Sequence, residues 1–225
     1  MITLYSILIT VSVYLFVRFL AKKYSSPLTS PVFLSTIMII TFLVVSNISY
    51  GEYMSAKKIM TYLLGPSTVA LAVPIYKNRD LFAKYFGAAF VGLSIGIVTT
   101  ITSAILLAKW LNLSDMFIRA LTVKSVTVPV ATEIGRIIDG NISLIAAYVI
   151  ITGMIGAMFG ARILNLFKIN HPFARGLAIG TIAHGIGTAE AVKEGELQGA
   201  VAGVAMGLAA VLISTFLPLI LPYLL

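Results

Sequence analysis

The chain has 225 residues, of which 59% are hydrophobic and only 11% are charged, and its mean hydropathy is +1.03. About a quarter of the residues of a soluble domain are charged, so this composition excludes a soluble domain and indicates an integral membrane protein. The formal charge of +8 points to no nucleic-acid partner, because the basic residues lie in short loops between apolar runs, and the absence of cysteine excludes disulfides and thiolate metal sites.

The chain reads as a succession of apolar segments. They lie near 2–21, 31–49, 59–76, 82–110, 117–138, 142–166, 173–191 and 197–224. Since a span takes about 20 residues, the sequence predicts a single all-α polytopic domain over residues 1–225, with seven to eight transmembrane segments. The first segment is followed, not preceded, by its basic residues, which is typical of an inserted helix rather than of a cleaved signal peptide.

Basic residues cluster in alternate connections. The clusters are Arg18, Lys22 and Lys23, then Lys77, Arg79 and Lys84, then Arg162, Lys168 and Arg175. Strict alternation results if segment 117–138 enters and leaves on one side, giving seven spans and a re-entrant element. The N-terminus is then outside the cell inner membrane and the C-terminus is cytoplasmic. A full crossing by 117–138 is the alternative.

Three segments begin with a polar, broken stretch and continue into a long glycine-rich helix. The stretches are 64–74, 124–129 and the region around residue 184. The residues expected to break helices are Pro66, Pro74, Pro129, Gly185 and Gly187. In lipid such breaks persist only where protein or water satisfies the freed carbonyls, so we expect discontinuous or re-entrant helices around an internal cavity. Ordinary proline kinks are the alternative, and the shared order hints at internal repeats.

Small residues recur four apart on the long helices. The expected packing positions are Gly92, Gly96, Gly156, Gly160, Gly199, Gly203 and Gly207. Such faces let helix backbones approach closely, and we expect them to support a homo-oligomer as well.

The stretch 174–191 is apolar enough for a membrane yet contains His184, Thr181 and Thr188. An ionisable group at membrane depth indicates a functional site, and a histidine can carry a proton or bind a carboxylate. The alternative is a core histidine bonded to a carbonyl.

Lys124 is a cation within another apolar stretch and is the natural counter-charge for an anionic substrate, unless it snorkels to the interface. The predicted substrate-binding residues are Lys124, Ser125, Thr127, His184, Thr188, Ser67 and Thr68. We expect no metal and no cofactor, because the only other histidine is His171 in a loop.

One string, Gly92-Leu93-Ser94-Ile95-Gly96, matches the G-x-S-x-G of serine hydrolases. It lacks the strand–turn–helix context that gives the string its meaning, so we expect that the protein is not an enzyme.

Three strings together resemble the LrgB/CidB family, and the likeness is strongest over 25–225. They are LGPSTVALAVPIYK (64–77), KSVTVPVA (124–131) and ARGLAIGTIAHGIGTA (174–189). The family includes antiholin-like and holin-like proteins and a plastid glycolate/glycerate translocator. The resemblance implies either of two functions. One is control of murein hydrolases and cell lysis beside a small LrgA/CidA-like membrane partner, and the other is transport of glycolate, glycerate or pyruvate.

The residues themselves favour the carrier, because a simple holin needs neither broken helices nor an intramembrane cation and histidine. The hypothesis is therefore a bilayer-embedded transporter of a small monocarboxylate, with a proton as a candidate coupling ion. The alternative is a holin/antiholin-type regulator that acts by assembly.

Overall fold

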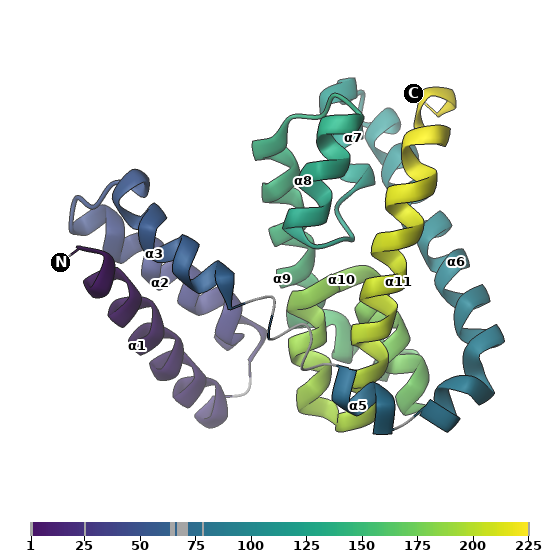
Figure 1. Cartoon of the computed structure of the whole chain (residues 1–225), viewed down its shortest axis with the longest axis horizontal. Coiled ribbons are helices and arrows are strands. Elements are labelled where there is room, and N and C mark those ends of the chain that lie inside the picture. Colours follow the sequence, from purple (N-terminus) through teal and green to yellow (C-terminus); the bar gives the residue numbers. More distant parts are fainter. Residues whose placement is uncertain (1, 25, 64–65, 67–71, 78, 225) are drawn as a thin grey trace. The chain divides into compact units, whose positions relative to one another are not determined.

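The computed structural model describes residues 2–24, 26–63, 66, 72–77 and 79–224, and every regular element in these ranges is a helix (Figure 1). The predicted all-α class is thus confirmed. The chain divides into two compact units, Met1–Val73 and Pro74–Leu225. That these units form a single domain stays a prediction.

The first unit is a group of three helices, α1 (Ile2–Lys23), α2 (Pro31–Val45) and α3 (Tyr50–Tyr62). Helix α1 contacts both others, and the Thr10 hydroxyl lies 2.9 Å from the Tyr53 hydroxyl. Helix α3 is capped by Ser49, and the side chains of Ser49 and Glu52 each accept a hydrogen bond from the other's backbone N–H. This reciprocal cap satisfies donors that a helix start leaves free.

The second unit contains four long helices and one pair of shorter ones among its described residues. Its elements are α6 (Arg79–Trp110), α7 (Asp115–Thr122), α8 (Val128–Ile137), α9 (Ile142–Leu166), α10 (Pro172–Glu194), α11 (Glu196–Ile220) and the 3₁₀ turn η2 (Leu221–Tyr223). The short α5 (Ala72–Lys77) crosses the division between the units. A buried apolar core joins α6, α7, α8, α9 and α11.

Helices α7 and α8 form a hairpin. The Arg119 guanidinium, on α7, donates to the carbonyl of Ile138, the C-cap of α8, so the two outer ends lie together. The chain reverses at residues 123–127, and α8 returns beside α9, as Figure 1 shows. This geometry agrees with the re-entrant interpretation of segment 117–138.

Helix α10 is a second hairpin, although segment 173–191 was predicted to cross the membrane. His184 interrupts it with φ 41° and ψ −137°. Arg175 Nη2 then lies 2.7 Å from Glu194 Oε1, whereas 19 residues of straight helix would separate them by about 28 Å. The prediction of a crossing by segment 173–191 was wrong, because hydropathy alone does not reveal that the chain turns back at His184.

Contacts between the ends of the long helices show which helix ends lie together in this unit. At the first end Tyr85, near the start of α6, contacts the rings of His171 and Phe173. At the opposite end Lys109 Nζ donates to the carbonyl of Leu224 over 2.7 Å. Helices α6 and α11 therefore run in one direction and α9 in the other. The α7–α8 hairpin enters from the C-terminal end and the α10 hairpin from the other end.

The described residues contain four helices that are long and apolar enough to span a membrane, so a count of seven to eight spans is not confirmed. They are Ile2–Lys23, Ala83–Trp110, Ile142–Leu166 and Glu196–Tyr223, with Pro31–Val45 shorter and apolar. Because α10 returns to its starting end, the connection 162–175 and the C-terminus lie at opposite ends. The predicted cytoplasmic C-terminus and a cytoplasmic basic connection at 162–175 therefore do not fit this fold together.

Candidate functional site

The tips of the two hairpins meet near the middle of the three spanning helices of the second unit. A Cβ built at Gly96 of α6 would lie 3.3 Å from Thr181 Cγ2, and one at Gly153 of α9 would lie 2.7 Å from His184 Cε1. A Cβ at Gly185 would lie 3.7 Å from Met206 Sδ on α11 and 3.9 Å from Thr127 Cγ2. The two broken segments thus approach each other at Thr127 and Gly185, far from either end of the spans.

Lys124 lies in the reversal of the first hairpin and is half-buried. Its ammonium donates to Thr100 Oγ1 at 2.7 Å and to the Thr100 carbonyl at 3.2 Å. None of the ion pairs formed within the described ranges includes Lys124. A cation among apolar helices without a carboxylate partner attracts an anion strongly, because little solvent screens it.

His184 is the tip of the second hairpin and is only 3% exposed. Its Nε2 lies 3.0 Å from the carbonyl oxygen of Val149 on α9. A carbonyl can only accept, so Nε2 carries the proton and Nδ1 is left as the nitrogen that can accept one. The positive φ of this non-glycine residue is unfavourable, and such backbone strain concentrates at functional sites.

Of the other predicted binding residues, those on the hairpins are placed near the tips. Ser125 is 1% exposed, and its hydroxyl lies 3.5 Å from that of Thr100. Thr127 is the N-cap of α8, while Thr188 donates to the carbonyl of His184 at 2.8 Å and so supports the break. Ser67 and Thr68 lie outside the described residues.

The helix breaks fall close to the predicted prolines and glycines, but these residues are not themselves the points at which the helices break. Pro129 stands in the first turn of α8, where a missing N–H costs nothing, and Pro74 is in the first turn of α5. Gly185 and Gly187 are helical. A Cβ at Gly187 would lie 2.4 Å from that of Ala183, so this glycine lets the two arms of α10 approach each other. Pro66 is described, but most of its neighbours are not.

Most of the predicted packing glycines face the α10 hairpin. Gly92 and Gly96 face Leu177 and Thr181, Gly156 and Gly160 face Ala183 and Ile179, and Gly199 faces Val192. A Cβ at Gly207 would meet nothing within 4 Å, so this position packs against no described residue. Gly203 is partly buried on the same helix.

Two helix N-termini also point to the meeting place of the hairpins. Helix α8 starts at Val128 and the second arm of α10 starts at Gly185. Each N-terminus carries roughly half a positive charge from its aligned peptide dipoles. Together with Lys124, they make the site electropositive without a metal, and the described residues contain no cluster of three metal-ligating side chains.

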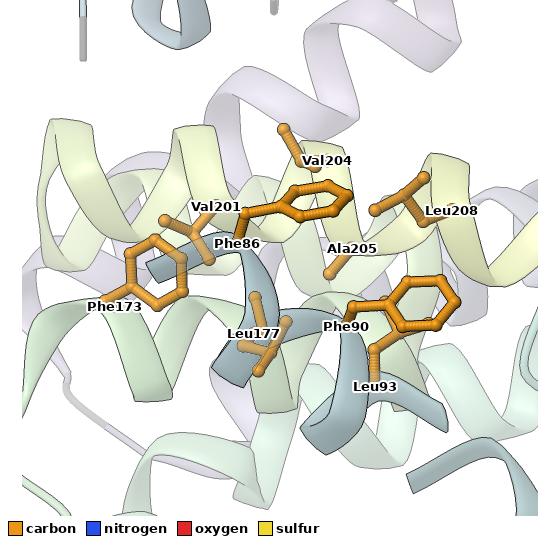
Figure 2. Close-up of a pocket in the computed structure, with 10 residues that line it drawn as sticks. Phe86, Phe90, Leu93, Phe173, Leu177, Val201, Val204, Ala205 and Leu208 are labelled. Carbon is orange, nitrogen blue, oxygen red and sulfur yellow. The ribbon is translucent and has the colours of Figure 1, made fainter. Parts of the chain in front are cut away.

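The pockets found along α6 are apolar and do not include Lys124 or His184. Figure 2 shows one of them, where Phe86, Phe90 and Leu93 of α6 face Leu177 and Val201. A second groove, along α6 and α11, includes Ser94. Ser94 lies within α6 and donates to the Phe90 carbonyl at 2.8 Å, so its string is ordinary helix and not a nucleophile elbow.

The fold and the site define a polytopic helical membrane protein in which two opposed hairpins bring a lysine and a histidine to mid-depth. The chain belongs to the LrgB-like family, whose model matches residues 10–223. The predicted family is thus confirmed.

Among curated proteins, the chain is similar to several from Bacillus. It is 33% identical to "Uncharacterized protein YwbG" of Bacillus subtilis (strain 168) over 83% of each chain. It is 31% identical to "Antiholin-like protein LrgB" of the same organism, over 76% of this chain and 74% of that one. No solved structure matches.

Proposed function

We propose that this protein is a carrier that moves small monocarboxylates of the glycolate, glycerate or pyruvate class across the cytoplasmic membrane. The observation that carries the proposal is the meeting of two opposed hairpin tips at mid-depth, with Lys124 lacking a carboxylate partner among the described residues. Transporters commonly place their sites where discontinuous helices meet near the bilayer midplane, with half-helix N-termini directed at the anionic group of the substrate.

Each residue has a role in this proposal. Lys124 and the N-termini of α8 and of the second arm of α10 attract the carboxylate, and Ser125, Thr127 and Thr188 orient it. His184, with Nδ1 left to accept, bonds the substrate or carries a coupled proton. Withdrawal of one hairpin at a time exposes the site to one side of the membrane.

The names of relatives support a second candidate, because antiholin-like proteins are among them. In this alternative the protein regulates murein hydrolase activity and lysis by assembling in the membrane, with a small LrgA/CidA-like partner. Gly207, which packs against no described residue, is available to either a homo-oligomer or such a partner.

The test of the carrier is uptake of labelled glycolate and pyruvate by liposomes that contain the purified protein and a trapped dye. We expect saturable uptake with the dye retained, and a loss of at least about tenfold in His184→Ala. Uptake without saturation and with dye release would instead support the assembly candidate. No signal in either assay, even with the partner present, would contradict both.

The charge at position 124 can be removed and restored in one protein, because the chain has no cysteine. We expect Lys124→Cys to abolish uptake and 2-aminoethyl methanethiosulfonate, which adds an ammonium to the thiol, to restore it. The sulfonatoethyl reagent, which adds an anion, should not. Arg136→Gln, which removes an exposed charge from the same hairpin, is the matched control and should keep its uptake. Equal recovery with both reagents would show that charge is not what position 124 contributes.

A further inference from the structure

The side chain that holds the Lys124 ammonium comes from α6, a helix in which the sequence indicated only glycine packing. Thr100 accepts two hydrogen bonds from Lys124 Nζ, through Oγ1 at 2.7 Å and through its carbonyl at 3.2 Å. The carbonyl also accepts from Ser103 Oγ at 3.3 Å, whereas the hydroxyl is the closer acceptor of the ammonium. This hydroxyl is therefore the main contact of the ammonium among the described residues.

Other hydroxyls in the long helices behave differently. Ser94 of α6 and Thr215 of α11 donate to carbonyls four residues earlier on their own helices, which is the ordinary way to satisfy a hydroxyl in lipid. Within the described residues of α6, the Thr100 hydroxyl makes no hydrogen bond to its own helix. It instead lies between Lys124 Nζ and Ser125 Oγ, which is 3.5 Å away.

This arrangement leaves Thr100 with a proton to donate. A hydroxyl that accepts from an ammonium can give its own hydrogen to Ser125 or to an anion that replaces it. Flexible lysine side chains have many rotamers, and holding one in place before binding removes part of the entropy that the ligand would otherwise have to supply.

We infer that Thr100 is a positioning residue that holds the Lys124 ammonium at the meeting of the hairpin tips for the carboxylate of the substrate. The inference rests on the proposed function and adds α6 to the site. Thr100 acts through Lys124, so its removal weakens binding more than it slows movement of the hairpins.

The experiment compares Thr100→Val, Thr100→Ser and Thr99→Val in the liposome assay with labelled glycolate and pyruvate. Thr99 is the matched control, since it is the same residue type one position earlier and is exposed. A hydrogen bond to a charged group predicts a KM for Thr100→Val that is roughly ten- to a hundredfold higher, with the maximal rate changed less than about twofold. Thr100→Ser should restore most of the affinity, and Thr99→Val should match the wild type.

A double-variant cycle separates positioning from a general packing defect. In a Lys124→Gln background, adding Thr100→Val should cause almost no further loss of equilibrium binding, because the bond is already absent. Losses that multiply, or an unchanged KM in Thr100→Val, would overturn the inference while leaving the carrier in place. A wild type that neither binds nor transports either acid would overturn the carrier itself, and the inference with it.

Discussion

At the scale of single residues, a glycine on α9 makes room for the ring of His184. Gly153 on α9 faces the ring of His184, and a Cβ built there would lie 2.7 Å from Cε1 and 2.9 Å from Nε2. Real Cβ atoms do not tolerate such distances, so a larger residue has to displace the imidazole. Gly153 therefore keeps the hydrogen bond between His184 and Val149 possible.

We predict that Gly153→Ala moves His184 without removing it and lowers uptake by about tenfold or more, since misplacing a binding group by an ångström is enough for such a loss. Gly160→Ala is the matched control on the same helix, because its Cβ would meet Ile179 Cγ1 at an ordinary 3.8 Å. Uptake kinetics of the two variants, with their amounts in the membrane equalised, make the comparison. Equal uptake in both would show that the ring position does not matter.

At the scale of elements, each hairpin is closed at its base by an arginine. Arg119 reaches the Ile138 carbonyl, and Arg175 makes charge-assisted bonds to Glu194 and also bonds Asn165 and the Ile169 carbonyl. In both hairpins the partners are 19 residues apart. We propose that this shared spacing, in hairpins that enter from opposite ends, reflects the internal repeat at which the sequence hinted.

We predict that Arg175→Gln opens the base of the α10 hairpin. It leaves Glu194 largely buried and unpaired, a change that lowers the free energy of unfolding by about 3 kcal/mol or more. The measurement is the midpoint of thermal unfolding of the detergent-solubilised protein, followed by size-exclusion chromatography. Arg162→Gln, an exposed charge at the same end, should hardly change the midpoint. The double variant with Glu194→Gln should recover part of the loss, and equal midpoints for the two single variants would contradict this role.

The two hairpins also show what local sequence can predict. The first was recognisable from Pro129, Lys124 and the hydroxyls around them, because such residues do not continue a lipid-facing helix. In the second, glycines at 185 and 187 indicated a weak helix, but the reversal depends on contacts between Arg175 and Glu194, which no local pattern contains. Thr100 was missed for the same reason. A threonine in an apolar helix is unremarkable until another element places a cation beside it, and only its position among Thr99, Thr102 and Ser103 was a signal.

At the scale of the second unit, charge and topology together give an orientation. The connections at one end carry Lys77, Arg79, Lys84, Arg162, Lys168 and Arg175, and the opposite end carries Lys109, Arg119 and Arg136. By the positive-inside rule we propose that the richer end lies in the cytoplasm and the C-terminus lies outside, the reverse of the orientation expected from counting segments.

We predict that single cysteines at Ser114 and Asn170, both exposed in connections at opposite ends, react with a membrane-impermeant thiol reagent from opposite sides. In intact cells Ser114→Cys should be labelled and Asn170→Cys protected, and lysis should expose both. The chain without cysteine is the background control. Labelling of both in intact cells would mean that segment 117–138, which contains α7 and α8, crosses the membrane after all.

In the proposed carrier, each hairpin closes the site toward one side of the membrane. While either hairpin is closed, the site communicates with one side at most, and solute crosses only as fast as the two hairpins open in turn. If both opened together, the same path would conduct freely and dissipate whatever gradient the cell maintains. A carrier and a lysis-promoting leak would then differ only in how strictly the opening of one hairpin keeps the other closed, and Thr127 and Gly185 lie where the two hairpin tips approach each other.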